Sequence, residues 1–217
     1  RKDKGTHKAL NRFRSFANSV SKNNTRTCWI LKCDVKKFFA SIDQQILLSL
    51  IKKRIDDLDA LWLVETILFS FAEQPDKGLP LGNVTSQLFA NIYLNELDQS
   101  IKHILKQKFY LRYCDDFIIL HQNKEYLENL IEPINNFLKN ELKLILHPDK
   151  IIIRKLRQGI DFLGYVTLPY HRVIRTKTKR RMLRLVNEKN IDSYLGICRH
   201  AYANGVKRLI EKKVSIT

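Results

Sequence analysis

The chain has 217 residues, 44% of them hydrophobic and 10% aromatic, which is typical of one or two globular domains and excludes a disordered segment. Its 39 lysines and arginines against 22 acidic residues give a formal net charge of +17, which favours a polyanionic partner such as nucleic acid or an anionic membrane. No apolar run reaches the roughly 20 residues of a transmembrane helix, and no secretory signal is visible. We therefore expect a cytoplasmic protein with no membrane partner. None of the four cysteines forms a Cys-x-x-Cys pair, so packed thiols are expected rather than a zinc site.

Hydrophobic periodicity and turn residues predict helices and strands intermixed along the chain. The expected helices cover residues 6–20, 41–51, 60–72, 85–106 and 124–140, and two basic helices follow residue 177. The expected strands cover residues 28–33, 109–113, 117–120, 150–155 and 160–168. Ser41 and Gln44 are expected to form a capping box, and Pro133 to kink or break its helix. Intermixed helices and hairpin strands predict an α+β fold.

Three acidic residues lie at the ends of apolar strands. Asp34 follows the strand 28–33, and Asp115 with Asp116 lies at the tip of the predicted hairpin. Unpaired carboxylates are costly to bury, and three together repel one another unless a cation lies between them. Mg²⁺ accepts a few carboxylates together with water and substrate phosphates. Two such ions about 4 Å apart would activate an attacking hydroxyl and stabilise a leaving oxygen. An Asp-Asp pair also occurs in plain turns, and Asp43 is expected only to cap a helix.

Four segments of the chain resemble the motifs of reverse transcriptases. The segment Tyr113-Cys114-Asp115-Asp116 resembles the Tyr-x-Asp-Asp box, and Asp34-Val35-Lys36-Lys37-Phe38-Phe39 resembles the first catalytic aspartate segment. Residues 81–87, Leu-Gly-Asn-Val-Thr-Ser-Gln, are similar to the nucleotide-pocket loop, and Phe162-Leu163-Gly164-Tyr165 is similar to the primer-grip turn. The segments occur in the family's order and cover residues 1–165. The resemblance implies the palm of a right-hand polymerase, with an antiparallel sheet packed on helices.

The resemblance also implies an activity and a set of catalytic residues. The activity is that of an RNA-directed DNA polymerase, a nucleotidyltransferase that extends a DNA primer on an RNA template with dNTPs. Asp34, Asp115, Asp116 and the backbone carbonyl of Val35 would bind two Mg²⁺ ions, for which Mn²⁺ can substitute. Lys150 would protonate the leaving pyrophosphate, since a lysine is charged at neutral pH, although a merely solvated lysine is an equal alternative.

The nucleotide pocket is where the sequence departs from most of the family. Phe39 would exclude a 2′-hydroxyl, or else belong to the core, and Gly82 and Gln87 would line the pocket. Leu81 and Gln87 stand where most members have Gln and Pro, and are expected to loosen the base-pair pocket. The form Gly-x-x-x-Ser-Gln resembles the enzymes of diversity-generating retroelements, which implies error-prone copying and a small basic accessory protein. A group II intron or retron reverse transcriptase is the alternative, and a non-catalytic RNA-binding relative is another.

The resemblance implies three domains. Residues 1–30 would be a remnant of the fingers, residues 31–168 the palm with its primer grip, and residues 169–217 a basic helical thumb that extends past the end of the chain. Because the chain starts at Arg1 rather than Met, we expect a fragment without most of its fingers. In the thumb, Lys179, Arg180 and Arg181 are expected to contact duplex phosphates, unless they lie on a merely solvated helix face.

Overall fold

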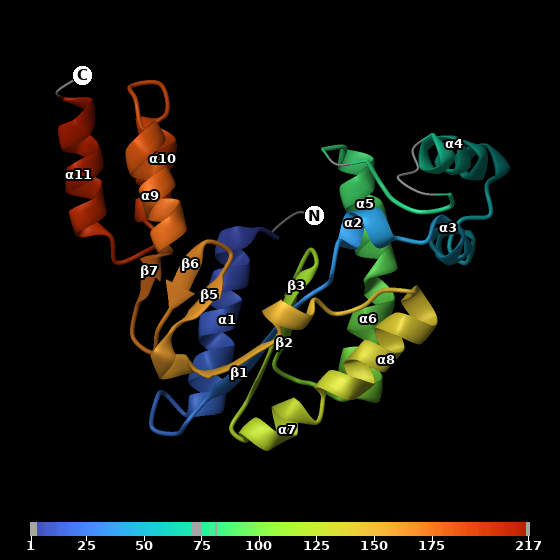
Figure 1. The fold of residues 1–217 in the computed structure, drawn as a ribbon, viewed down its shortest axis with the longest axis horizontal. Helices are drawn as coiled ribbons and strands as arrows, with labels where there is room; N and C mark the ends of the chain where they lie inside the picture. Colours follow the sequence, from blue (N-terminus) through green and yellow to red (C-terminus); the bar gives the residue numbers. More distant parts are fainter. Residues whose placement is uncertain (1–3, 71–74, 81, 216–217) are drawn as a thin grey trace. The chain divides into compact units, whose positions relative to one another are not determined.

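The computed structural model describes residues 4–70, 75–80 and 82–215, and its contacts divide the chain into two compact units (Figure 1). The first unit joins residues 1–30 to residues 154–217, and the second unit comprises residues 31–153. The second unit therefore holds the three acidic residues, whereas the first holds the predicted primer grip and the basic C-terminal helices. The division into fingers, palm and thumb stays a prediction.

The second unit is built on a four-stranded sheet of order β2-β3-β1-β4. Its strands are β1 (Trp29–Asp34), β2 (Tyr110–Tyr113), β3 (Asp116–His121) and β4 (Ile152–Lys155), of which β1 and β4 continue into the first unit. The two inner strands, β3 and β1, carry the apolar runs because they are covered most completely: Phe117, Ile118 and Ile119 of β3 are fully buried. The hairpin β2–β3 is antiparallel, with Tyr113 opposite Asp116, so its turn consists of Cys114 and Asp115. The predicted hairpin is confirmed.

The second unit also contains helices, most of which lie to the right of this sheet in Figure 1. They are α2 (Phe38–Ser41), α3 (Gln44–Lys52), α4 (Leu58–Phe69), α5 (Val84–Tyr93), α6 (Asn95–Gln99), the π-helix η1 (Ser100–Ile104), α7 (Lys124–Glu128), α8 (Ile131–Leu142) and the short 3-10 helix η2 (Pro148–Lys150). The single helix expected over residues 85–106 is divided into α5, α6 and η1. Apolar spacing alone does not separate α from π hydrogen bonding, which explains this error.

One local prediction in the second unit is wrong, and another is confirmed. Ser41 ends α2 instead of capping α3, and the N-cap of α3 is Asp43, whose side chain accepts a hydrogen bond from the Ile46 amide at 2.9 Å. Gln44 is buried, and its Nε2 donates to the carbonyls of Leu68 and Gly78 at 3.1 and 3.0 Å. The helix expected over residues 124–140 is broken ahead of Pro133, as predicted: α7 ends at Glu128 and α8 begins at Ile131. Pro133 lies in the first turn of α8, where its missing N–H has no helical partner to lose.

The first unit packs a helix against a small sheet. It contains α1 (Thr6–Ser21), the 3-10 helix η3 (Leu156–Gln158), strands β5 (Ile160–Phe162), β6 (Tyr165–Thr167) and β7 (Arg172–Ile174), and helices α9 (Thr176–Leu185), α10 (Ile191–Cys198) and α11 (Asn204–Val214). The rings of Phe13 in α1 and Phe162 in β5 are fully buried and meet edge to face, with centroids 6.0 Å apart. Residues 160–168 were predicted as one strand, but they form the antiparallel hairpin β5–β6. The tail holds three helices rather than two.

The helices of the described residues are too short or too polar to cross a membrane: none combines the length and the apolar character that a span needs. The most apolar helix surface of the second unit belongs to α4, where Leu58, Trp62 and Leu63 are 80%, 67% and 52% exposed.

Candidate active site

The three acidic side chains predicted from sequence come together at one end of the sheet of the second unit. Asp34 is the last residue of β1, Asp116 is the first residue of the neighbouring strand β3, and Asp115 lies in the turn between β2 and β3. The backbone carbonyl of Asp34 accepts a hydrogen bond from the His147 amide at 2.8 Å, which fixes the end of β1. Strand adjacency therefore brings together acids that are more than 80 residues apart in the chain.

Two lysines compensate the charge of these carboxylates. The Nζ of Lys150, at the end of η2, donates to Oδ2 of Asp34. The Nζ of Lys32 lies 3.1 Å from Oδ2 of Asp116. Lys32 and Asp34 are two residues apart on β1, so they share one face of the sheet. Sequence reasoning missed Lys32, although a charged residue inside an otherwise apolar strand was a visible signal.

The surroundings of Asp115 and Asp116 oppose the ionisation of their carboxyl groups. Burial, together with the charges of Asp34 and Asp115, raises the pKa of Asp116 to about 6 against the opposing effect of Lys32. Burial also raises the pKa of Asp115, and the charge of Asp34 adds to this effect while Lys150 opposes it. The hydrogen bond to Asp34 raises the pKa of Lys150, so this lysine is a cation at neutral pH. The cluster is thus short of positive charge even with both lysines present.

The donor set fits a divalent cation in its chemistry. Three carboxylates supply the hard oxygen ligands that Mg²⁺ prefers, and Oδ1 of Asp116 is buried without a hydrogen-bond partner. In the part of the chain that the structure describes, however, no three Asp, Glu, His or Cys side chains converge closely enough to hold an ion between them. Binding an ion here therefore requires these side chains to reorient and Lys150 to release Asp34.

The predicted nucleotide-pocket residues also lie in the second unit. Phe39 is half-buried in α2, with its ring 5.2 Å from that of Phe38. Gly82 has a φ of 96°, a conformation that favours glycine, and open space surrounds the position of a Cβ atom. Gln87 is exposed on the second turn of α5, where its amide nitrogen lies 3.4 Å from the Asn83 carbonyl. Leu81 lies outside the described residues. The side chain of Val35 is buried at the end of β1, and its backbone pairs with Leu146 in an isolated bridge.

The predicted primer grip is the turn of the β5–β6 hairpin in the first unit. Phe162 and Tyr165 are paired across the turn, and both side chains are buried. Leu163 and Gly164 form the turn with φ values of 53° and 85°. A two-residue turn with positive φ at both positions matches the twist of an antiparallel hairpin, but it is unusual for a leucine. The Leu163 position therefore stores backbone strain.

The net positive charge of the protein belongs to the first unit. Its 94 residues carry 24 lysines and arginines against 5 acidic residues, whereas the second unit has 15 against 17. The first unit therefore has a formal charge of +19 and the second a formal charge of −2. On α9, Arg180 and Arg181 are exposed and Lys179 is half-buried, and among the described residues none of the three forms an ion pair. Composition showed the excess charge, but only the fold separated it from the acidic site.

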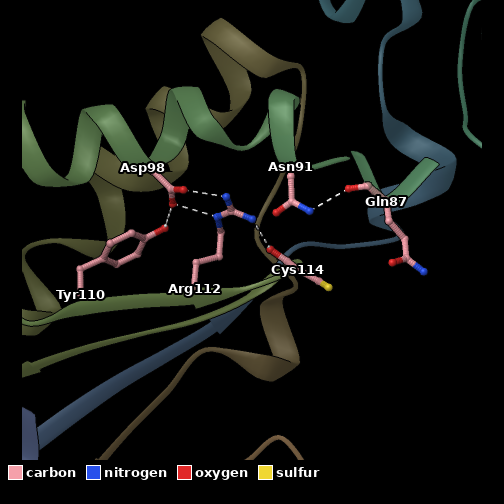
Figure 2. Close-up of polar contacts among 6 residues, drawn as sticks. All are labelled: Gln87, Asn91, Asp98, Tyr110, Arg112 and Cys114. Atoms are coloured by element: carbon pink, nitrogen blue, oxygen red, sulfur yellow. Dashed lines mark hydrogen bonds and ion pairs between the residues drawn. The ribbon is translucent and has the colours of Figure 1, made fainter. Parts of the chain in front are cut away.

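A second polar cluster, which the sequence did not reveal, lies next to the turn of Cys114 and Asp115 (Figure 2). Arg112 of β2 extends its guanidinium to the carboxylate of Asp98 on α6, with its Nε 2.8 Å from Oδ1 and its Nη2 2.6 Å from Oδ2. Its third nitrogen, Nη1, donates to the carbonyl of Cys114 at 2.8 Å. Tyr110 donates to the same Asp98 carboxylate at 2.6 Å. An arginine next to Tyr113 in a largely apolar strand was the only signal for this cluster.

Solved structures share this fold. A telomerase from Candida albicans, in complex with a TWJ fragment of telomeric RNA, matches 96% of this chain and 42% of its own length with a TM-score of 0.64 and 12% identity. An apo telomerase from Candida tropicalis matches 85% of this chain and 38% of its own length with a TM-score of 0.62 and 15% identity. Identities this low show the fold alone, which is the α+β fold of a polymerase.

Relatives in sequence name the family. Protein YkfC of Escherichia coli strain K12 is 28% identical over 204 residues, which cover 75% of this chain and 51% of YkfC. The group II intron-encoded protein LtrA of Lactococcus lactis subsp. cremoris is 26% identical over 63% of this chain and 34% of its own length. The retron Ec73 reverse transcriptase of Escherichia coli is 28% identical over 65% of this chain and 46% of its own length. The chain thus spans about half, or less, of the length of these relatives.

Residues 1–167 match the family described as reverse transcriptase (RNA-dependent DNA polymerase), so the chain belongs to the reverse transcriptase family. The resemblance drawn from the sequence motifs is confirmed, as is the α+β polymerase fold.

Proposed function

We propose that this chain carries the catalytic centre of an RNA-directed DNA polymerase, which extends a DNA primer on an RNA template with dNTPs. The observation that carries the proposal is the meeting of Asp34, Asp115 and Asp116 at the ends of two neighbouring strands, in a chain of the reverse transcriptase family. A non-catalytic RNA-binding relative would have no use for three carboxylates whose burial and mutual repulsion oppose their ionisation.

The proposed chemistry assigns a role to each group of the cluster. Asp34, Asp115, Asp116 and the Val35 carbonyl would hold two divalent ions, Mg²⁺ or Mn²⁺. Such ions, when bound, activate the primer hydroxyl and stabilise the leaving oxygen. Lys150 would release Asp34 as the carboxylate binds metal, and would then protonate the leaving pyrophosphate, since its ammonium is charged at neutral pH. Lys32 would stay beside Asp116 and limit the negative charge of the site.

Primer extension tests this function directly. The protein is incubated with an RNA template, an annealed DNA primer and dNTPs, with Mg²⁺ or Mn²⁺ in parallel. We expect extension with either ion and none with EDTA. Template-dependent extension that survives EDTA would exclude the proposed chemistry. If neither ion yields extension although the protein is folded and binds primer–template, the proposal fails.

The ring of Phe39 is proposed to select the sugar of the incoming nucleotide. The Phe39→Ala variant is expected to incorporate ribonucleotides at least tenfold more readily relative to deoxynucleotides, because removing the ring removes the clash with a 2′-hydroxyl; tenfold corresponds to about 1.4 kcal/mol. The measurement is the ratio of kcat/KM values for a ribonucleotide and its deoxynucleotide. Phe38→Ala is the matched control, since Phe38 is buried beside it. An unchanged ratio in Phe39→Ala would assign Phe39 to the core.

The basic first unit is proposed to bind the nucleic-acid backbone. RNA as a partner agrees with the RNA held by the Candida albicans telomerase of the same fold. Phosphate contacts of this kind weaken with salt in proportion to their number, by a slope of about 0.9 for each phosphate on duplex DNA.

Neutralising Lys179, Arg180 and Arg181 together, each to Gln, is expected to lower the slope of log affinity against log salt by about 2 to 3. The measurement is fluorescence anisotropy of labelled primer–template between 50 and 300 mM salt. The matched control neutralises Lys102, Lys106 and Lys108 of the second unit, which also removes three charges. A slope that changes equally in both variants would show that the effect comes from net charge and not from α9.

We further propose error-prone copying of the kind performed by diversity-generating retroelements, assisted by a small basic accessory protein. The segment from Gly82 to Gln87, with Ser86 buried and Gln87 exposed on α5, supports this branch. The names of the relatives, a group II intron-encoded protein and a retron reverse transcriptase, favour the alternative. Sequencing of the cDNA decides between them: a large excess of substitutions opposite template adenines is expected for the first branch. A low and uniform error rate would assign the chain to the second.

A further inference from the structure

The hydrogen bonds of Arg112 join the Cys114–Asp115 turn to α6, which directly follows α5, the helix that carries the proposed nucleotide-pocket residue Gln87. We propose that Asp98 and Arg112 are a positioning pair, which holds the Cys114–Asp115 peptide at a fixed place relative to α5 and α6. The inference rests on the proposed function, because it concerns where that function places its carboxylate and its incoming nucleotide. Neither residue touches the reacting atoms, so the pair acts through Asp115 and Gln87.

The guanidinium of Arg112 binds two acceptor groups at once. The Nε and Nη2 atoms of Arg112 bind the two oxygens of Asp98 as a fork, and Nη1 points to the Cys114 carbonyl (Figure 2). Only a planar group with several N–H donors reaches both acceptors at once, since a lysine ammonium acts as a single point charge. The Arg112 side chain is 5% exposed, so water does not compete for these donors.

The turn that Arg112 contacts has a strained backbone. Cys114 has a φ of 55°, a left-handed conformation that is unfavourable for a residue other than glycine. Its carbonyl belongs to the peptide bond that leads directly into Asp115. The Arg112 bond to this oxygen therefore fixes the peptide plane that sets the direction of the Asp115 side chain. A strained turn persists only where its surroundings stabilise it, and here Arg112 provides a stabilising hydrogen bond.

Helices α5 and α6 connect Asp98 to Gln87 of the proposed nucleotide pocket. Helices α5 and α6 meet at Leu94, which keeps helical dihedrals; its amide donates to Ala90, and the Asp98 amide donates to Leu94, each at 3.1 Å. Gln87 lies eleven residues before Asp98 on this run, about 16 Å along a helix axis. Asn91 reinforces the run, because its side chain donates to the Gln87 carbonyl at 2.7 Å (Figure 2). The Asp98–Arg112 ion pair thus links the Asp115 turn to the consecutive helices α6 and α5, and through them to Gln87.

Contact with Asp98 influences the protonation of both Arg112 and Tyr110. Burial by itself would lower the pKa of Arg112, but the hydrogen bond and the charge of Asp98 outweigh it and raise this pKa. Burial raises the pKa of Tyr110 well above its ordinary value, and the charge of Asp98 adds to that effect. Tyr110 therefore remains a phenol that donates to Asp98, and Arg112 remains a cation.

The test uses Arg112→Lys in the full chain, because lysine keeps the charge beside Asp98 but does not reach both acceptors. We expect kcat for primer extension to fall by tenfold to a hundredfold, the range that a displacement of about 1 Å costs. We expect KM for the dNTP to change less than kcat, and misincorporation to increase, because the carboxylate moves relative to the pocket. The stability-matched control is Leu138→Ala in α8, a fully buried residue away from the turn. Arg112→Lys activity equal to that of a control with the same Tm would overturn the inference.

Two further measurements do not depend on polymerase activity. Mn²⁺ titration of the protein alone, followed by EPR of the free ion, is expected to show at least fivefold weaker binding in Arg112→Lys than in Leu138→Ala. Amide hydrogen exchange is expected to accelerate at Cys114, Asp115 and Asp116 and to stay unchanged in the middle of β3. If the wild-type protein neither extends primers nor binds Mn²⁺, the proposed function fails, yet accelerated exchange confined to the turn upholds the positioning role. Exchange at the turn that equals the control overturns it. Asp98→Asn, which keeps one acceptor oxygen, serves if Arg112→Lys does not fold.

Discussion

Primer extension by the Asp115→Asn variant is expected to be at least a thousandfold slower than extension by the wild-type protein. The substitution keeps the size of the side chain but removes the negative charge at the tip of the turn, where Asp115 meets Asp34. Metal-ion stabilisation of the charge that develops in the reaction contributes several kcal/mol, and each 1.36 kcal/mol corresponds to tenfold in rate. The measurement is single-turnover extension by one nucleotide with saturating dNTP and Mg²⁺.

The control for this variant is Asp149→Asn, which removes one negative charge from the same unit. Asp149 lies next to Lys150 in η2, and its side chain is 89% exposed. We expect its activity to stay within about twofold of wild type, because a charge this exposed is screened by water and salt. Asp115→Asn that keeps more than a tenth of the wild-type rate would remove Asp115 from the catalytic centre.

The second large effect concerns stability. The Asp116→Asn variant is expected to be more stable than wild type at pH 7.5, by about 2 kcal/mol, although it loses activity. The pKa of Asp116 is about 6 in the folded protein and roughly 3.9 in the unfolded chain, and a shift of two units corresponds to about 3 kcal/mol. Some of this gain is lost, because the amide leaves Lys32 without its ion pair.

The direction of the pH dependence follows from proton counting. Between pH 4 and pH 6 the folded protein holds the Asp116 proton and the unfolded chain does not, so the free energy of unfolding of wild type falls as pH rises. The Asp116→Asn variant has no carboxyl group at this position, so its free energy of unfolding does not show this decrease. The two proteins should therefore have similar Tm values at pH 4, and Tm values about 4–8 °C apart above pH 6, since 1 kcal/mol shifts Tm by about 2–4 °C in a chain of this size.

Divalent ions provide a second check on the same residue. Because a bound cation relieves the repulsion among the three carboxylates, millimolar Mg²⁺ or Mn²⁺ should raise the Tm of wild type more than that of Asp116→Asn. The difference between the two proteins should shrink accordingly. If Asp116→Asn is less stable than wild type at pH 7.5 without metal, burial does not oppose ionisation of Asp116 and the electrostatic account of the cluster is wrong.

Several features of the fold were predictable because they depend on local sequence. The apolar runs of β1 and β3, the hairpin and helix α1 follow from hydrophobic periodicity, which reports burial directly. The errors have local causes as well. Both Ser41 and Asp43 were candidate N-caps for α3. Asp43 caps the helix, and the side chain of Gln44 is buried, where it donates to two backbone carbonyls instead of completing a capping box. The π-helix η1 leaves no distinct trace in apolar spacing, whereas Pro133 did predict the break between α7 and α8.

The sequence by itself determined the family, the three acidic residues and the large positive charge, because motif order, residue type and composition are properties of the chain alone. Only the tertiary structure decided which groups surround those acids. Lys32 and Lys150 reach the carboxylates, and Arg112 reaches both Asp98 and Cys114, through strand order and helix packing rather than through spacing in the sequence. The structure likewise assigned the positive charge to one unit and the acids to the other. The physical reason is that electrostatic and hydrogen-bond energies depend on distances in space, and residues far apart in the chain acquire those distances only when the sheet forms.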